Sequence, residues 1–152
     1  ALINLKVRPA LDQGWNLRLR YSDELGIDKI SNHGAIDEDI KNSKLVVCTY
    51  PSTTFLEAML SNTPTVLVYS KEVWELRPEF GELLKRLKKV KIVFIDSESA
   101  ANHINDISYD PRIWWDNYET LEARKYFNNQ CGAVSENWLK EWSDFFHFEL
   151  NN

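Results

Sequence analysis

The chain has 152 residues, 43% of them hydrophobic and 27% charged, which is typical of a folded globular domain. Six Trp, six Tyr and seven Phe beside only five Gly and five Pro exclude a disordered or fibrous protein. The formal net charge of −5 gives no overall attraction for nucleic acid, so no nucleic-acid partner is expected. No apolar run approaches the length of a membrane span, about 18 residues.

The amino-terminal segment predicts short strands separated by loops. Ile3–Arg8 is expected to be a strand, whereas the alternation in Trp15–Tyr21 is compatible with a short strand or a loop. Asp28–Ser31 is a further candidate strand. Turn residues follow it: Asn32, His33 and Gly34. Because an apolar run opens the chain without a methionine, we expect it to be a fragment of a longer protein, cut so that a strand lies at its edge.

The middle of the chain alternates strand and helix patterns. In chain order these are a helix at Ile36–Asn42, a strand at Leu45–Tyr50, a helix at Thr53–Ser61, a strand at Thr65–Tyr69, a loop at 71–78 with Trp74 buried, an amphipathic helix at Glu79–Lys89, a strand at Ile92–Ile95 and a helix at Ser97–Ile107. Ser52 and Ser97 are expected to cap the helices that they precede or begin. The spacing predicts parallel strands joined by helices, hence a doubly wound α/β fold with a mainly parallel sheet of four or five strands.

After Pro111 the chain has no strand pattern and predicts two helices, Ile113–Asn128 and Glu136–Leu150. The second helix carries an apolar aromatic stripe formed by Trp138, Trp142, Phe145 and Phe146. We therefore divide the chain into a Rossmann-like domain at residues 1–110 and carboxyl-terminal helices at residues 111–152. These helices are expected to pack on the same domain or on a missing amino-terminal half.

The remaining charged and metal-ligating residues give weaker signals. A basic run near the end of one helix is interpreted as a solvated face that complements the helix dipole: Lys85, Arg86, Lys88, Lys89 and Lys91. Cys48 is expected to be a buried thiol inside a strand. Cys131 is distant in the sequence and the three His are dispersed, so we expect no metal site, and no cofactor.

The most informative segment is the turn between the apolar strand at 45–50 and the helix after it. Ser52, Thr53 and Thr54 place three hydroxyls at a helix amino terminus that follows the carboxyl end of a parallel strand. Ligands of open α/β sheets bind at that edge, and helix amino termini favour anions such as phosphate. Glu57, one turn later, could accept hydrogen bonds from a ribose diol. An ordinary serine cap is the structural alternative.

Several segments of the chain together resemble known transferases. They are Arg8-Pro9, Gly14-Trp15, Ser43–Tyr69, the run Ala100–Asn105 and the pair Trp114-Trp115. Ser43–Tyr69 resembles the donor-binding half of GT-B-type glycosyltransferases, and the whole set resembles a transferase family of bacterial surface-carbohydrate (O-antigen type) biosynthesis. The chain departs from the wider GT-B pattern because no glycines precede the helix.

The resemblance implies a Rossmann-like carboxyl-terminal half of a GT-B enzyme that binds a nucleotide sugar. Residues implied to hold the donor diphosphate are Ser52, Thr53, Thr54 and Arg8, and Glu57 would touch the ribose or order the loop. The turn of Asn32, His33 and Gly34 is a candidate nucleobase loop, because it follows a short strand at the ligand edge. No residue stands out as the general base, which we expect on the missing half. The intact enzyme is expected in the cytoplasm, where peripheral association with the membrane's inner face is compatible with its pathway.

Two alternatives remain open at this point. The segment after Ser43 also resembles the phosphate-binding segment of polyol-phosphate (teichoic-acid type) polymerases, which use CDP donors. The other alternative is a non-catalytic interaction domain that docks through the aromatic helix. Nucleotide preference separates the first alternative from a glycosyltransferase, and absence of nucleotide binding would favour the second.

Overall fold

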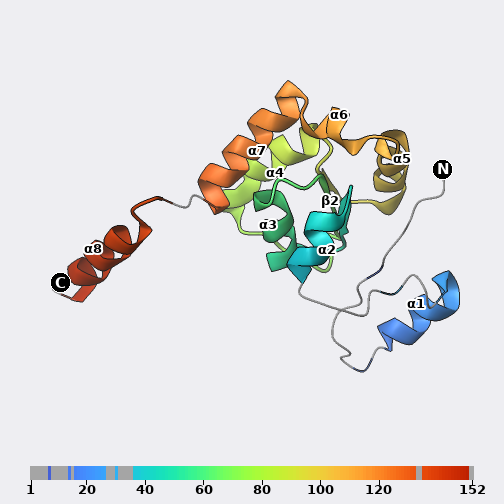
Figure 1. Ribbon diagram of the computed structural model, residues 1–152, viewed down its shortest axis with the longest axis horizontal. Coiled ribbons are helices and arrows are strands. Elements are labelled where there is room, and N and C mark those ends of the chain that lie inside the picture. The colour runs from blue at the N-terminus through green and yellow to red at the C-terminus, as the bar shows by residue number, and fades with distance from the viewer. Residues whose placement is uncertain are drawn as a thin grey trace.

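The structure is a computed structural model that describes residues 7, 14, 16–26, 30, 36–132 and 135–150. Figure 1 shows helices arranged around a small sheet. The elements are α1 (Leu17–Leu25), α2 (Ile36–Asn42), β1 (Val46–Cys48), α3 (Thr53–Leu60), β2 (Thr65–Val68), a 3₁₀ turn (Pro78–Phe80), α4 (Gly81–Lys89), β3 (Val93–Phe94), α5 (Ser97–Ile107), α6 (Pro111–Trp115), α7 (Tyr118–Cys131) and α8 (Trp138–Leu150).

The sheet has three parallel strands in the order β1-β2-β3. Val46 pairs with Thr65, and Leu67 pairs with Val93. Val7 and Ile30 form an isolated parallel bridge, while the other residues of the two predicted amino-terminal strands lie outside the described residues. A mixed α/β fold with a parallel sheet is thus confirmed, and a sheet of four or five strands stays a prediction.

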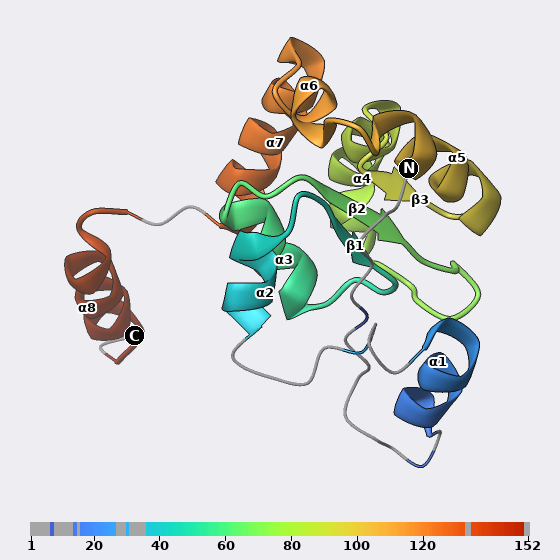
Figure 2. The same ribbon diagram turned by 45° about the vertical axis from the view of Figure 1, so that its right-hand side comes forward.

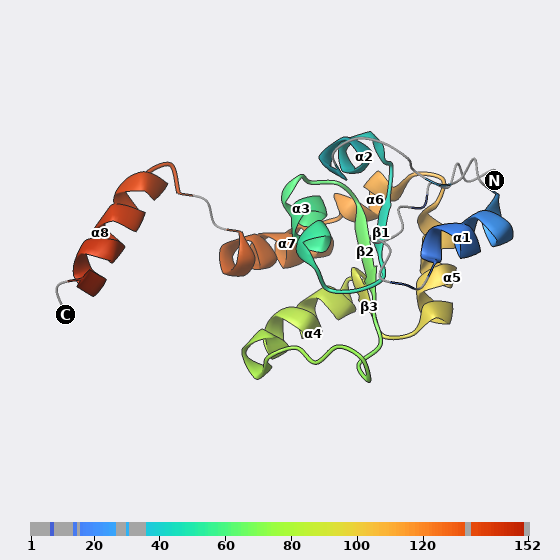
Figure 3. The same ribbon diagram turned by 90° about the horizontal axis from the view of Figure 1, so that it is seen from below.

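Helices lie on both faces of this sheet. Figures 2 and 3 show α3, α4 and α7 on one face and α5 on the other. The central strand β2 is almost entirely enclosed, because Thr65 and Val66 are 0% exposed and Leu67 is 1% exposed. Enclosure of a strand on both faces explains why its sequence is a continuous apolar run rather than an alternating one.

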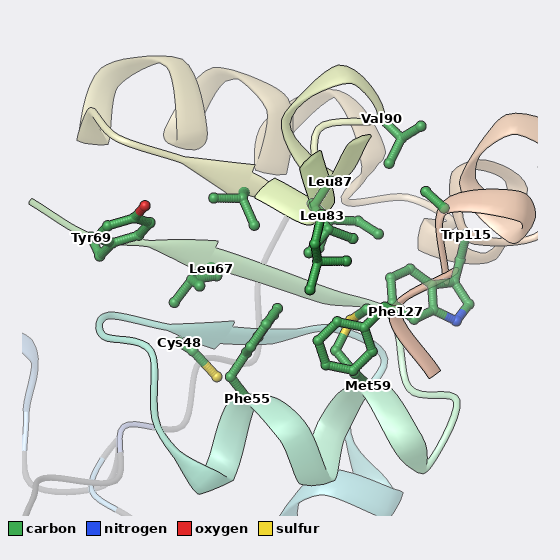
Figure 4. Close-up of a cluster of buried hydrophobic side chains, with 13 residues drawn as sticks. Cys48, Phe55, Met59, Leu67, Tyr69, Leu83, Leu87, Val90, Trp115 and Phe127 are labelled. Carbon is green, nitrogen blue, oxygen red and sulfur yellow. The ribbon is translucent and has the colours of Figure 1, made fainter. Parts of the chain in front are cut away.

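The main core lies between the sheet and the helices α3, α4, α6 and α7. Figure 4 shows Phe55 and Met59 of α3 facing Leu67 of β2, with Leu87 and Phe127 in the same cluster. Phe55 and Phe127 contact edge to face, with ring centroids 5.6 Å apart. The segment after Pro111 therefore contributes side chains to the same core as the strands.

The prediction of a strand or loop at Trp15–Tyr21 was wrong, because Leu17–Leu25 forms α1. No residue of α1 is buried, so no sheet face is present to select the alternating arrangement of Leu17, Leu19 and Tyr21. Gly26 ends the helix with a φ of 93°, a left-handed conformation that glycine adopts without steric cost.

The predicted helix Ile113–Asn128 is two helices, α6 and α7, that meet at Asp116 and Asn117. The Asn117 side chain caps α7 by accepting a hydrogen bond from the Glu119 N–H at 3.0 Å. The expected cap at Ser97 was also wrong. Asp96 caps α5, and its carboxylate accepts a 2.7 Å hydrogen bond from the Ser99 N–H.

The aromatic stripe of α8 is solvent-exposed. Trp138, Trp142, Phe145 and Phe146 are each at least 50% exposed, and no residue of α8 is buried. Figures 1 and 3 show α8 apart from the layers of the fold. The packing partner expected for this helix, and the division of the chain at residue 110, stay predictions.

Candidate functional site

The start of α3 follows directly from the carboxyl end of β1. Ser52 occupies the cap position with extended backbone angles, φ −134° and ψ −179°. Its carbonyl oxygen accepts hydrogen bonds from the N–H groups of Phe55 at 3.0 Å and Leu56 at 3.3 Å. β1 ends at Cys48, Pro51 has no N–H to donate to a strand, and the small polar residue Ser52 occupies the cap position, so the helix begins at Thr53.

The hydroxyls at this turn have no partner among the described residues. Ser52 makes no side-chain cap hydrogen bond, and the hydroxyls of Thr53 and Thr54 make no hydrogen bond to a described residue. Thr53 and Glu57 are both exposed and are four residues apart, so they share one side of α3. The opposite side carries Phe55 and Met59 into the core. The structure therefore places Thr53 and Glu57 on one exposed side of α3.

The neighbouring helix at the same sheet edge begins differently. Asp96 places a carboxylate at the first turn of α5. This carboxylate accepts a hydrogen bond from the Ser99 N–H, which lowers the pKa of Asp96. An anion is thus already present at the start of α5. The amino terminus of α3 has no such internal anion, so its partial positive charge remains available to a ligand.

Two aromatic residues lie at the same edge. Tyr50 follows β1 and stacks on Trp74 of the loop after β2, with ring centroids 5.6 Å apart and planes at 17°. Trp74 was expected to be buried, but its side chain is 42% exposed, although Tyr50 stacks on it. The sequence signal for this pair was weak, since Tyr50 and Trp74 are distant in the chain and neither lies in a strand or helix.

Four of the predicted site residues cannot be placed. Arg8, Asn32, His33 and Gly34 lie outside the described residues, so their proposed roles stay predictions. In the described part of the chain, no group of three or more His, Cys, Asp or Glu side chains could hold a metal ion. None of the described helices is long and apolar enough to span a membrane.

Cys48 lies at the end of β1, close in sequence to the candidate turn. It is 7% exposed, as expected, and burial raises the pKa of its thiol to about 11. At neutral pH the thiol is therefore protonated and is a poor nucleophile. Its role is to fill the core between β1 and α3.

A polar cluster behind the site was not predicted from the sequence. Asn62 adopts a left-handed φ of 59°, and its side-chain oxygen accepts hydrogen bonds from Trp115 Nε1 at 3.0 Å and Arg124 Nη2 at 2.6 Å. The Arg124 guanidinium also donates to the Trp115 carbonyl at 2.8 Å and lies over the Trp115 ring. This cluster ties the end of α3 to α6 and α7. It joins two segments, the loop at Asn62 and the tryptophan pair, that are distant in the sequence.

One comparison with known proteins gave a match. A family model described as LIC12162 family transferase matches residues 3–146. No curated protein matches the chain, and no solved structure matches it. The matched range includes the start of α3, the loop after β2 and the Asn62 cluster.

Proposed function

The chain belongs to the LIC12162 family of transferases, and we propose that it binds the donor of a glycosyltransferase-like enzyme, a nucleotide-diphosphate sugar. The observation that carries this proposal is the open start of α3, which lies at the carboxyl edge of a parallel sheet with no side-chain cap. Open α/β sheets bind ligands at that edge. We further propose that the enzyme acts in bacterial surface-polysaccharide biosynthesis, in the cytoplasm or at the inner face of the membrane.

The proposed mechanism divides the work between charge and hydrogen bonds. The first N–H groups of α3 and the hydroxyls of Ser52, Thr53 and Thr54 would bind the donor diphosphate. The same groups would stabilise the negative charge that develops on the departing diphosphate during transfer. Glu57 would accept a hydrogen bond from the ribose, and Arg8 would add a positive charge.

Thermal-shift measurements with UDP, dTDP, GDP, CDP and CMP test the proposal. One nucleotide should stabilise the protein, by about 2.7 kcal/mol when its free concentration is 100 times its Kd. The double variant Ser52→Ala/Thr53→Ala should abolish that shift. The matched control Ser97→Ala/Ser99→Ala changes two serines at the start of α5, where Asp96 already supplies the cap, and should keep it.

The outcome also separates the alternatives. A preference for CDP over the other nucleotides would favour a polyol-phosphate transferase. If no nucleotide binds, and Ser52→Ala/Thr53→Ala changes only the stability of the helix start, the donor-binding proposal is wrong. The exposed stripe of α8 would then favour a protein-interaction domain.

We expect the 152-residue chain to bind the donor without transferring the sugar. The proposed donor-binding groups are hydroxyls and a ribose-binding carboxylate, and we propose that the general base is supplied by residues outside this chain. Incubation with a radiolabelled nucleotide sugar and acceptor glycans should give no labelled product. Formation of labelled product by the chain alone would contradict the proposal that it binds the donor without transferring the sugar.

A further inference from the structure

A hollow lies next to the carboxyl end of β2, where Tyr69 lines it. It has a volume of about 850 Å³ and opens between the loop after β2 and α4. Its apolar walls include Trp74, Leu76 and Leu84. We call it the loop–α4 hollow and define it by residues 69, 71–76, 81, 84, 85 and 88. A monosaccharide fits within this volume, which lies in the usual range of about 300–1,000 Å³ for ligand pockets.

One side of α4 faces this hollow. Gly81, Leu84, Lys85 and Lys88 all line it, and their spacing of three, four and seven residues places them on one stripe of the helix. Leu83 and Leu87 are buried against the sheet instead. The basic residues of α4 are therefore not one uniform solvated face, because Lys85 and Lys88 are directed to the hollow.

Three lysines line the hollow without a charge partner. Lys71, Lys85 and Lys88 make no ion pair with any described residue, although Glu72 and Glu75 line the same hollow. Four of the described lysines outside the hollow have carboxylate partners, namely Lys41, Lys89, Lys125 and Lys140, whereas Lys44 and Lys91 have none among the described residues. The unpaired ammonium groups leave a local positive charge that an anion would neutralise.

The charged form of Lys88 is disfavoured in this arrangement. It is partly buried on the apolar wall of the hollow, and its pKa is lowered by burial and then by the nearby Lys71 ammonium. Lys71 and Lys88 thus line one hollow with like charges, and Lys88 is partly removed from water. A bound anion would relieve both effects, because it supplies the missing opposite charge.

Trp74 supplies a surface of a different kind. Tyr50 stacks on its indole and holds the ring, which remains 42% exposed beside the lysines. An exposed, held indole presents an apolar face on which a sugar ring can lie. Glu72 and Glu75 on the same hollow offer carboxylate oxygens to sugar hydroxyls.

We propose that the loop–α4 hollow binds an anionic sugar, that is, a monosaccharide unit carrying a phosphate or a carboxylate. The lysines bind the anion, the indole of Trp74 packs on the sugar ring, and the two glutamates accept hydrogen bonds from hydroxyls. The site is separate from Ser52, Thr53 and Thr54, none of which lines the hollow. Its occupancy therefore does not depend on the proposed donor site.

NMR titration of the ¹⁵N-labelled chain tests the proposal with glucose 6-phosphate, glucuronate, glucose and inorganic phosphate as probes. The indole N–H of Trp74 should shift on addition of glucose 6-phosphate or glucuronate, and the tighter of the two identifies the anion as phosphate or carboxylate. Lys71→Gln/Lys88→Gln should weaken that binding by about tenfold, since two charge-assisted contacts are lost. Trp74→Leu should reduce the affinity to that of inorganic phosphate.

The matched control is Lys41→Gln/Lys44→Gln, which removes two exposed lysines that do not line the hollow and changes the net charge equally. Its affinity should equal that of the unaltered chain. Ser52→Ala/Thr53→Ala should also leave anionic-sugar binding unchanged. The proposal for the donor site and the proposal for the hollow can therefore be contradicted independently. The proposal is overturned if neither anionic sugar shifts Trp74, if glucose binds as tightly as they do, or if both lysine pairs have the same effect.

Discussion

Cys48 and Cys131 differ in burial, and this difference should be visible in their reactivity. Burial raises the pKa of both thiols, to about 11 for Cys48, while Cys131 is only partly buried. Iodoacetamide at pH 8 should therefore modify Cys131 first in the folded protein and Cys48 only after unfolding. Mass spectrometry of timed samples measures both rates. Rapid labelling of Cys48 in a folded Cys131→Ser variant would contradict its enclosed position.

His103 on α5 is a buried titratable group with an unusual environment. It is 5% exposed, its Nε2 atom has no hydrogen-bond partner among the described residues, and it packs against the rings of Phe94 and Trp114. Burial and the Lys91 charge lower its pKa, and Asp106 opposes them. The folded protein therefore favours neutral His103.

The sign of the pH effect follows from this lowered pKa. Above the unfolded pKa of about 6.5 the imidazole is neutral in both states, so its contribution to stability is fully present. As pH falls from 6.5 toward the folded pKa, the unfolded chain takes up the proton first and the free energy of unfolding decreases. Urea unfolding at pH 5, 6 and 7 should show a smaller pH dependence for His103→Leu than for the unaltered chain. An equal pH dependence for His103→Leu and the unaltered chain would contradict this role of His103.

At the scale of elements, the Asn62 cluster holds α3 against α6 and α7. Arg124 is 9% exposed and donates to both Asn62 and the Trp115 carbonyl. Arg124→Met should lower the free energy of unfolding by about 2 kcal/mol, because buried acceptors lose charged hydrogen-bond donors. Chemical denaturation measures the change. Arg112→Met, at an exposed position on α6, should cost far less, and equal costs would show that the cluster is not the cause.

The elements predicted correctly are those with a strong internal pattern. β1, β2, β3 and the helices between them were expected from apolar runs and helical spacing, although each strand is shorter than predicted. The wrong predictions concern helix boundaries that a single polar side chain determines by capping. Asn117 divides the predicted helix into α6 and α7, and Asp96 replaces Ser97 as the cap of α5. Several residues in these segments can cap, and only the backbone geometry shows which one does.

At the scale of the whole molecule, the core ends with α7. Phe127 is 2% exposed and belongs to the main cluster, whereas no residue of α8 is buried. Removal of residues 135–152 should therefore leave the thermal midpoint unchanged and should lower the tendency to self-associate, since an exposed apolar stripe is removed. Calorimetry and light scattering measure the two effects. A clear fall in the midpoint would show that α8 packs on the rest of the chain in solution.

Leu87→Ala provides the comparison for that truncation. Leu87 is 1% exposed and lies between α4 and the sheet. Its truncation should destabilise the protein by about 2–5 kcal/mol through lost burial and a residual cavity. Truncation of this one side chain should thus lower the stability more than the loss of the whole of α8.

By itself, the sequence determined the parallel strand–helix alternation and the hydroxyl turn at Ser52, Thr53 and Thr54, because both depend on patterns within a few neighbouring residues. It could not determine what lies beside that turn. The Tyr50–Trp74 stack, the Asn62–Arg124 contact and the convergence of Lys71 with Lys88 join residues from separate elements. Such contacts are decided by tertiary packing, since the packing alone determines which charges meet, which remain unpaired, and where a ligand can neutralise them.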